Sequence, residues 1–389
     1  MSPLLIFAGF FFFSVAYNML GPLATNIMST TGMSLTASGS LLSIQQVGAV
    51  ISIALLIFLQ KRIKQSSIMR FGYIVIIFSF FLITSIQSTY AVFTAYLMLG
   101  FGSFLVDSGT NSYLASTYFE KRALYIPLLH FVYSAGAIAT GYLILPFKNE
   151  KWFGAYTTVG IIFLIILTAQ LLNNRKERLN HDGQPRRKEI VQGPVLPLLK
   201  DPAFLLYTSV ILLYMGSQIV CSAWIPVYVE TELGQSAAVT GTSLTLFWAG
   251  TALSRLIIGP ILNKGGKPYI LSIWGMLLAG LSLFAAGILT TNIVIVLILV
   301  TLCGFFAGST IPMYLVVCST WYPNNTTFIS LSYILSGTIG RMIFPFLVAY
   351  IASFTNLGFS LGLSSGMLFI SALIILIVKK ITVSRPEYK

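Results

Sequence analysis

The strongest constraint in this sequence is a series of twelve long apolar runs separated by short polar breaks. Each run holds roughly 20 residues, which is the length that an α-helix needs to cross the hydrocarbon core of a bilayer. Lipid offers the backbone no hydrogen-bond partners, and continuous runs of this kind satisfy their own amides as helices rather than as barrel strands. The sequence therefore predicts an all-α membrane protein with twelve transmembrane helices. The predicted spans lie near 3–28, 37–60, 68–88, 91–118, 124–147, 152–173, 203–229, 237–262, 269–289, 293–318, 328–353 and 357–378.

Composition supports this prediction. Of the 389 residues, 56% are hydrophobic and only 8% are charged, whereas a soluble domain carries about 25% charged residues. So few polar groups could not cover a water-soluble core of this size. The first apolar run is too long for the core of a signal peptide and lacks a basic start, so we expect it to be the first span.

The cysteines and histidines predict neither a disulfide framework nor a metal site. Cys221, Cys303 and Cys318 all lie inside apolar runs, and Cys303 and Cys318 are too far apart along one helix to be bridged. The two histidines have no clustered ligands around them. We therefore expect no metal and no bound cofactor.

The distribution of basic residues predicts the topology. The net charge is +13, but the excess lies almost wholly on one side of the predicted spans, and the other side has only Lys148 and Lys151. By the positive-inside rule, both termini are cytoplasmic, and the expected location is the plasma membrane, as in a bacterial cytoplasmic membrane. The excess therefore reflects topology and excludes nucleic acid as a partner. The residues on the basic side are Lys61, Arg62, Lys64, Arg70, Lys121, Arg122, Arg175, Lys176, Arg178, Arg186, Arg187, Lys188, Lys200, Lys264, Lys267, Lys379, Lys380, Arg385 and Lys389.

The two halves of the chain resemble each other. A polar segment, residues 174–202, is predicted to be a cytoplasmic linker between a bundle of six helices in residues 1–173 and a second bundle in residues 203–389. Similar residues recur at a spacing of 201 to 203, which predicts two pseudo-symmetric repeats with a binding site near the bilayer midplane between them. Alternating access is inferred from this architecture. The recurring pairs are Gly39 with Gly241, Gly72 with Gly275, Tyr113 with Tyr314, and Gly136 with Gly337.

Three charged side chains lie well inside predicted spans: Asp107, Arg255 and Arg341. A charge at the bilayer centre costs roughly 2.5–3.5 kcal/mol on insertion scales, so each is a functional hypothesis. Asp107 shares a helix face with Gly100, Ser103 and Asn111. Burial makes the ionised carboxylate costly, so it can take up and release a proton near neutral pH. The alternative is a structural partner for an arginine.

The other ionisable residues leave alternatives open. Arg341 can donate to a substrate oxygen or to Asp107, or it can snorkel or bond to another helix. For Arg255 we expect structural pairing. His130, near the cytoplasmic end of span 5, is expected to be a hydrogen-bonded packing residue, with a proton relay as the alternative.

Polar and aromatic residues inside the spans are the candidate solute contacts. Gly21 and Pro22 are predicted to bend or break span 1, and Pro226 occupies a comparable place in span 7. Broken helices expose backbone at the midplane, where transporters bind solutes. Amides and aromatic faces suit a neutral polyol, although each aromatic also has a packing interpretation. Together with Asn111, His130 and Arg341, the candidate contacts are Tyr17, Asn18, Gln45, Gln46, Gln218, Trp224, Trp248 and Tyr314.

Several segments resemble the fucose–galactose–gluconate proton symporters of the major facilitator superfamily and the related glucose transporters. The segments are GFGSFLVDSGTN in span 4, LLHFVYSAGA in span 5 and FWAGTALSRLIIG in span 8. The resemblance implies two six-helix bundles and a sugar-binding role for the matching polar positions. All the positions that match the family pattern, polar and apolar together, are Asp107 and Asn111; Leu129, His130, Tyr133, Gly136 and Ala137; Trp248, Gly250, Arg255 and Gly259; and Pro312, Pro323, Gly337, Gly340 and Pro345.

The chain departs from that family at three places. Family symporters often carry a second acidic residue in span 1 where this chain has Gly21. Arg341 occupies a usually small position, and the loop after span 2 is degenerate here as QKRIKQSSIMRFG. The absence of an acidic residue at Gly21 leaves Asp107 as the only buried carboxylate, so facilitative transport without a proton stays open as an alternative.

The favoured hypothesis is a monomeric, proton-coupled transporter of a sugar or polyol that uses Asp107. The alternatives are an organic-anion carrier that uses Arg341 and an exporter of drugs, lipids or lipophilic metabolites. An enzyme would need a nucleophile–base pair or a metal cluster, and the sequence shows neither.

Overall fold

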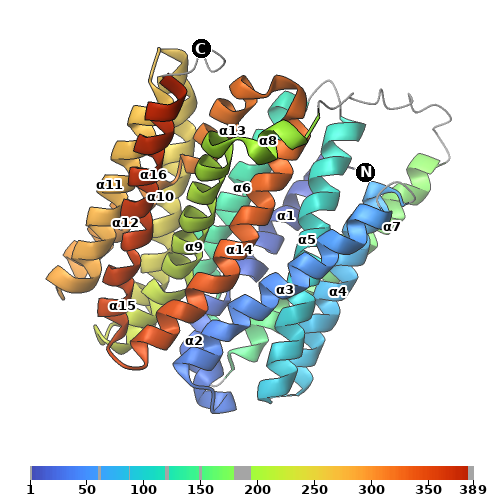
Figure 1. Ribbon diagram of the computed structural model, residues 1–389. Helices are drawn as coiled ribbons and strands as arrows, with labels where there is room; N and C mark the ends of the chain where they lie inside the picture. Colours follow the sequence, from blue (N-terminus) through green and yellow to red (C-terminus); the bar gives the residue numbers. More distant parts are fainter. Residues whose placement is uncertain are drawn as a thin grey trace. The chain divides into compact units, whose positions relative to one another are not determined.

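The computed structural model describes residues 2–59, 63–86, 88–118, 122–148, 151–178 and 194–383. Every regular element in these ranges is a helix (Figure 1). The chain divides into two compact units, Met1–Glu189 (unit 1) and Ile190–Lys389 (unit 2). The division falls within the predicted linker, of which residues 179–193 lie outside the described ranges.

Eleven of the described helical segments are long and apolar enough to cross a membrane. The pair α1 (Pro3–Asn18) and α2 (Leu20–Thr31) adds a twelfth if the two count as one span, bent by 47°. Two further spans are interrupted: α12 (Ile293–Ala307) passes into α13 (Thr310–Trp321), and α15 (Leu357–Ser364) into α16 (Gly366–Val383). The predicted all-helical membrane architecture is confirmed.

Unit 1 is built on five main helix pairings. Helix α5 packs against both α3 and α4, α1 packs against α6 and α7, and α4 also packs against α7. Figure 1 shows α3, α4 and α5 side by side. The bounds are Leu35–Leu59 for α3, Gln65–Ser85 for α4, Thr89–Thr117 for α5, Arg122–Leu143 for α6, Leu145–Phe147 for the short helix η2, and Phe153–Arg178 for α7.

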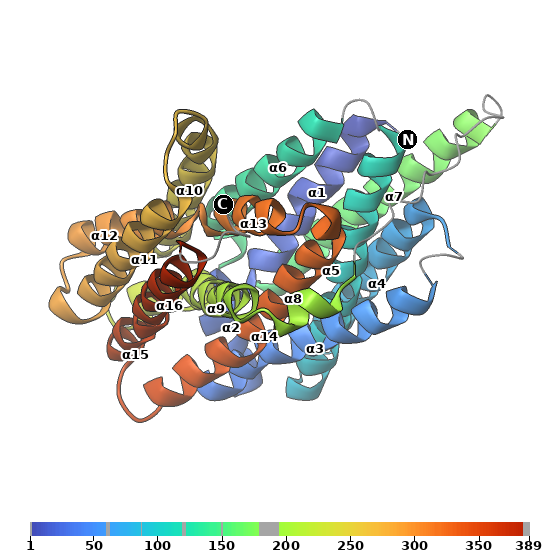
Figure 2. The ribbon, with the colours of Figure 1, turned by 45° about the horizontal axis from the view of Figure 1, so that its top comes forward.

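Unit 2 repeats these five pairings. Helix α12 packs against α10 and α11, α9 packs against α14 and α16, and α11 also packs against α16, as Figure 2 shows for α11, α12 and α16. The remaining bounds are Leu196–Lys200 for α8, Pro202–Thr231 for α9, Ala237–Asn263 for α10, Pro268–Phe284 for α11, Ala285–Leu289 for η3, Pro323–Asn325 for η4, and Thr326–Ala352 for α14.

Glycines allow the paired helices to approach closely, and the contacts recur between the units. A methyl group at Gly100 would overlap the carbonyl oxygen of Gln45, and one at Gly304 would overlap that of Phe247. Gly304 thus takes the same place between α10 and α12 that Gly100 takes between α3 and α5. Three more pairs behave alike: Gly48 against Leu97 and Gly250 against Thr301; Gly72 against Gly102 and Gly275 against Phe306; Gly136 against Phe11 and Gly340 against Leu212.

These contacts show which residues of the two units correspond, and they correct the spacing predicted from the sequence. Helices α3 and α10 correspond at a spacing of 202, whereas α5 and α12 correspond at 204, because Gly100 matches Gly304. The predicted match of Tyr113 with Tyr314 is therefore wrong by three residues, close to one helical turn. The contact of Gly136 likewise has its counterpart at Gly340.

The bend in the first span has a local cause. Pro22 has no N–H to offer to the carbonyl of Asn18, four residues earlier, and its ring clashes with that carbonyl. The helix breaks there, between Asn18 and Leu20, which confirms the bend predicted from Gly21 and Pro22. In span 7 the expectation of a break is wrong, since α9 continues through Pro226 to Thr231.

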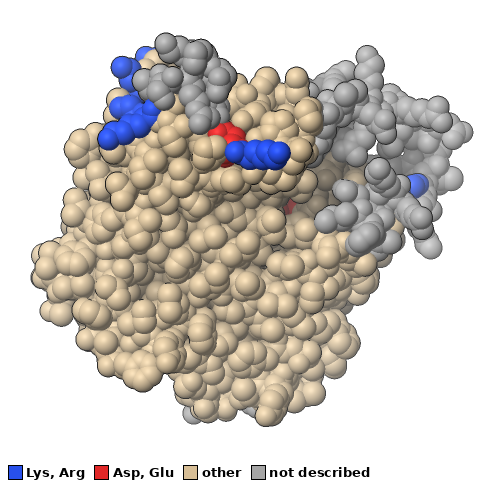
Figure 3. Space-filling view, in the orientation of Figure 1, with Lys and Arg blue, Asp and Glu red and all other residues tan. Residues whose placement is uncertain are grey.

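The ends of unit 2 differ in charge. Figure 3 shows Lys and Arg gathered at one end of its helices, above a surface that is almost entirely uncharged. At this end Asp201 caps α9 by accepting from the N–H groups of Ala203 and Phe204, and the Tyr322 hydroxyl donates to it at 3.0 Å. At the opposite end Glu232 accepts from the N–H groups of Leu357 and Gly358 at the start of α15. Carboxylates at helix N-termini are favourable partners of the helix dipole.

We predict that Gly100→Ala and Gly304→Ala each lower the free energy of unfolding by about 1–3 kcal/mol, because the added methyl forces the paired helices apart. Gly259→Ala is the matched control, since it also lies in a helix but no heavy atom lies within 4 Å of the position of its added methyl. Thermal unfolding in detergent measures all three. If the two buried variants are as stable as Gly259→Ala, the assigned close approach is wrong.

Candidate functional site

Unit 1 carries a polar stripe on α5 around its central carboxylate. The Asn111 side-chain amide donates to Oδ1 of Asp107 at 2.9 Å and to the Asp107 backbone carbonyl at 3.0 Å. Both residues are half-buried, whereas Ser103, one turn earlier, is buried. The spacing of four residues places Asn111 directly over Asp107, so the amide orients the carboxylate. The shared face predicted from the sequence is therefore present.

Helices α3 and α1 add neutral polar groups to unit 1. The Gln46 side-chain amide donates to the Tyr17 hydroxyl at 2.9 Å, which joins α3 to α1. Gln45, the neighbouring residue, is only 1% exposed, and its amide has no hydrogen-bond partner among the described residues. The Ser103 hydroxyl is buried in the same way. A buried polar group without a partner costs about 1–3 kcal/mol, so such groups favour a place that water or solute enters.

The other two candidates of unit 1 are placed differently. The Asn18 side chain donates to the carbonyl of Ser14 in its own helix at 2.8 Å and is buried. Ser14 in turn donates to the carbonyl of Tyr133 at 2.6 Å, which joins α1 to α6. The expectation that His130 is a packing residue is wrong, since its side chain is exposed; its carbonyl accepts from the Ser134 hydroxyl. Asn18 thus lies at the bend of the first span.

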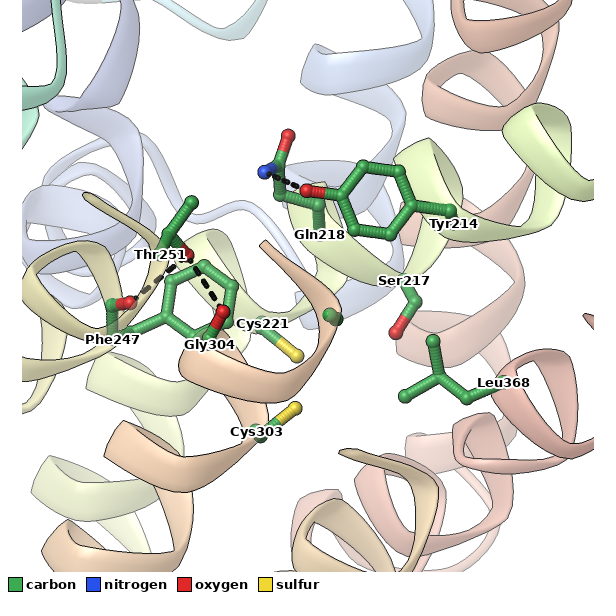
Figure 4. Close-up of a pocket in the computed structure, with 10 residues that line it drawn as sticks. Tyr214, Ser217, Gln218, Cys221, Phe247, Thr251, Cys303, Gly304 and Leu368 are labelled. Atoms are coloured by element: carbon green, nitrogen blue, oxygen red, sulfur yellow. Dashed lines mark hydrogen bonds between the residues drawn. The ribbon is translucent and has the colours of Figure 1, made fainter. Parts of the chain in front are cut away.

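Unit 2 contains a small cavity between α9, α10, α12 and α16, with room for about one water-sized molecule. Its walls combine hydroxyl, amide, thiol and apolar groups (Figure 4). On α9 the Gln218 amide donates to the Tyr214 hydroxyl at 2.8 Å. The lining residues are Tyr214, Ser217, Gln218, Cys221, Phe247, Thr251, Cys303, Gly304, Ala307 and Leu368.

Most of the cavity wall was not predicted. Of the candidates from the sequence, only Gln218 lines it. Ser217 and Thr251 were not predicted, because a serine or threonine within an apolar run is usually interpreted as a packing position. Thr251 donates to the carbonyls of Phe247 and Gly304, so the close glycine contact of α10 with α12 also shapes this wall. The recurrence of Gly100 as Gly304 is the signal that could have pointed here.

Three aromatic candidates of unit 2 are packed away from the cavity lining. Trp224 is fully buried, and its indole N–H donates to the carbonyl of Pro345 on α14 at 3.1 Å. Tyr314 is fully buried, shares a hydrogen bond with Thr208 at 2.8 Å and packs against the ring of Tyr207. Trp248 is buried with its ring edge-on to Phe247. Their predicted role as solute contacts stays a prediction.

Arg255 donates a hydrogen bond at the break between α12 and α13. Pro312 lacks the N–H that would otherwise bond to the carbonyl of Gly308, four residues earlier. The Arg255 Nε–H donates to this carbonyl at 3.2 Å, and the guanidinium also contacts the Tyr214 hydroxyl. A charged donor on a buried carbonyl is a strong hydrogen bond. This is the structural pairing expected for Arg255.

Arg341 lies in α14 and is half-buried. Its guanidinium is 3.8 Å from the sulfur of Met215 and 3.4 Å from the Thr338 hydroxyl. Both contacts are within unit 2 and are weak in geometry. A role toward a solute anion therefore stays a prediction.

A family model described as the Major Facilitator Superfamily matches residues 6–271 and 206–389. The chain belongs to this superfamily. Membership of this superfamily agrees with the predicted transporter class. The narrower resemblance to the fucose–galactose–gluconate symporters remains an expectation.

The superfamily assignment agrees with individual relatives. The yeast Saccharomyces cerevisiae "Bypass of stop codon protein 6" is 24% identical over 272 residues, which cover 61% of this chain but only 53% of that protein. A bacterial homologue of the human lysosomal transporter Spinster superimposes with a TM-score of 0.82 at 13% identity, over 97% of this chain and 96% of that one. A D-xylose–proton symporter gives a TM-score of 0.72 at 14% identity, over 100% and 98% of the two chains. The two structures share the fold of this chain.

We predict that Arg255→Met lowers the free energy of unfolding by about 1–3 kcal/mol, because the Gly308 carbonyl is left buried without its donor. Adding Pro312→Ala restores an N–H that can bond to this carbonyl, so the double variant should regain most of the loss. Thermal unfolding of the two single variants and the double variant measures the coupling. Purely additive losses would show that Arg255 does not act through Gly308.

Proposed function

We propose that this protein is a proton-coupled transporter of a small neutral polar solute, a sugar or polyol, with Asp107 as the proton-carrying group. The observation that carries the proposal is the half-buried Asp107 carboxylate, oriented by Asn111 on a polar stripe in the interior of α5. A carboxylate is costly inside a membrane and persists there chiefly for function. Transport by alternating access, in a plasma membrane with both termini cytoplasmic, is part of this proposal.

The neutral groups support the solute class. In unit 1 the buried amide of Gln45 and the pair Gln46–Tyr17 supply donors and acceptors without net charge. In unit 2 the pair Gln218–Tyr214 and the hydroxyl of Ser217 supply the same chemistry at a cavity wall. Amides and hydroxyls donate and accept at once, which matches the hydroxyl groups of a polyol. A site built this way discriminates strongly against analogues that lack those hydroxyls.

We predict that Asp107→Asn abolishes accumulation of the solute against its gradient while counterflow exchange continues. The amide keeps the shape and the contact with Asn111 but cannot carry a proton. Uptake into energised vesicles, with and without a protonophore, measures accumulation, and preloaded vesicles measure counterflow.

Asp201→Asn is the matched control for that experiment. It makes the same change in a carboxylate that caps α9, and asparagine is an equally good N-cap. This control should accumulate solute as the unaltered protein does. Full gradient-driven accumulation by Asp107→Asn would show that Asp107 is not the coupling group.

The panel of solutes decides the class. Sugars and polyols, carboxylates and lipophilic dyes are offered in turn to the same vesicles. Uptake of carboxylates alone, lost on Arg341→Gln, would replace the polyol assignment with an organic-anion carrier. Efflux of dyes without uptake of either other class would identify an exporter.

A further inference from the structure

Two free cysteines from different helices meet at the wall of the unit 2 cavity. Cys221 lies on α9 and Cys303 on α12, and their exposed fractions are 1% and 2%. Their sulfur atoms lie near each other at the wall of this cavity (Figure 4). Both residues line the cavity. The sequence separates them by 82 positions, so only the packing of α9 with α12 brings them together.

The third cysteine provides a contrast. Cys318 lies on α13 and is also free and fully buried, but it contacts the Tyr314 side chain rather than another thiol. It is not among the residues that line the cavity. The chain therefore holds a thiol pair that borders a cavity and a lone buried thiol.

We propose that Cys221 and Cys303 form a two-sulfur binding site for a soft, thiophilic metal or metalloid centre that enters through the unit 2 cavity. Thiolate sulfur selects soft centres over hard ones. Within the described residues no group of three or more His, Cys, Asp or Glu side chains could hold a metal. A tetrahedral zinc site, which needs three or four protein ligands, does not fit. A centre that binds two sulfurs fits.

The net charge of the occupied site limits which ligands fit. A divalent ion that displaces the proton from each thiol forms two metal–sulfur bonds, releases two protons and leaves a neutral product. A monovalent ion would leave one negative charge inside the membrane, where charges are costly. Trivalent arsenic in phenylarsine oxide also gives a neutral product: two arsenic–sulfur bonds form, the arsenic–oxygen bond breaks, and one water leaves. The oxidation state of arsenic and sulfur does not change.

Phenylarsine oxide is therefore the probe for this site. The reduced, full-length protein in detergent is incubated with the reagent and then with an excess of a monothiol or a dithiol. We expect one adduct by intact mass, with two thiols protected from N-ethylmaleimide. The adduct should resist the monothiol, because arsenic released from one cysteine is still held by the other. The dithiol should remove the adduct, because it can bind arsenic through two sulfurs itself.

Cysteine variants assign the bridge. Cys221→Ser and Cys303→Ser should each lose the monothiol-resistant adduct completely, and Cys318→Ser should form it as the unaltered protein does. Cys221→Ala and Cys303→Ala repeat the test where a serine variant unfolds at lower temperature. An unaltered protein without the adduct, an adduct that survives either change of the pair, or its loss in Cys318→Ser would overturn the proposal.

Transport gives a second readout that rests on the proposed function. A bridge between α9 and α12 should stop uptake, and the dithiol should restore it. The adduct assay needs no solute, so failure of the uptake measurement with an intact adduct would count against the proposed function and not against the dithiol site. Uptake that continues unchanged in fully bridged protein would show that α9 and α12 need not separate there during transport.

Discussion

Close contact between helix backbones is the constraint on which both units depend. Inside a bilayer the hydrophobic effect does not drive helices together, so their association relies on van der Waals packing and hydrogen bonds. Gly100 against α3 and Gly304 against α10 let the chains approach to a distance that a side chain would forbid. The same five helix pairings recur in both units, and the cavity wall of unit 2 lies along one of these contacts.

Prolines are the second constraint on the helices. Each proline removes one backbone hydrogen bond, and the lipid around the helix cannot supply another partner. Pro22 bends the first span at Asn18, which places a side-chain amide there. Pro312 frees the carbonyl of Gly308, and Arg255 takes it. Helix α9 instead runs on through Pro226. Whether a helix breaks at a proline or continues through it therefore depends on the packing around that proline.

The packing repeats between the units, but the charged chemistry does not. With the register set by the glycine contacts, Asp107 corresponds to Ile311, Arg255 to Ile53 and Arg341 to Ala137. Each of these three charged side chains therefore has an apolar counterpart in the other unit. Duplicated glycines maintain the helix contacts in both units, while single substitutions on that framework supply a carboxylate in unit 1 and guanidinium groups in unit 2.

Sequence alone determined the features that depend on local spacing. Hydrophobic runs set the positions of the helices, Pro22 set the bend of the first span, and the spacing of Asp107 and Asn111 set their contact, since residues four apart share one face of any helix. Only the tertiary structure decided which faces meet. It joined Gln46 to Tyr17, brought Cys221 near Cys303, and packed Trp224 against α14. These contacts cross between helices, and in a membrane the partner of a face depends on fitting two surfaces together, which the spacing of residues along one helix does not specify.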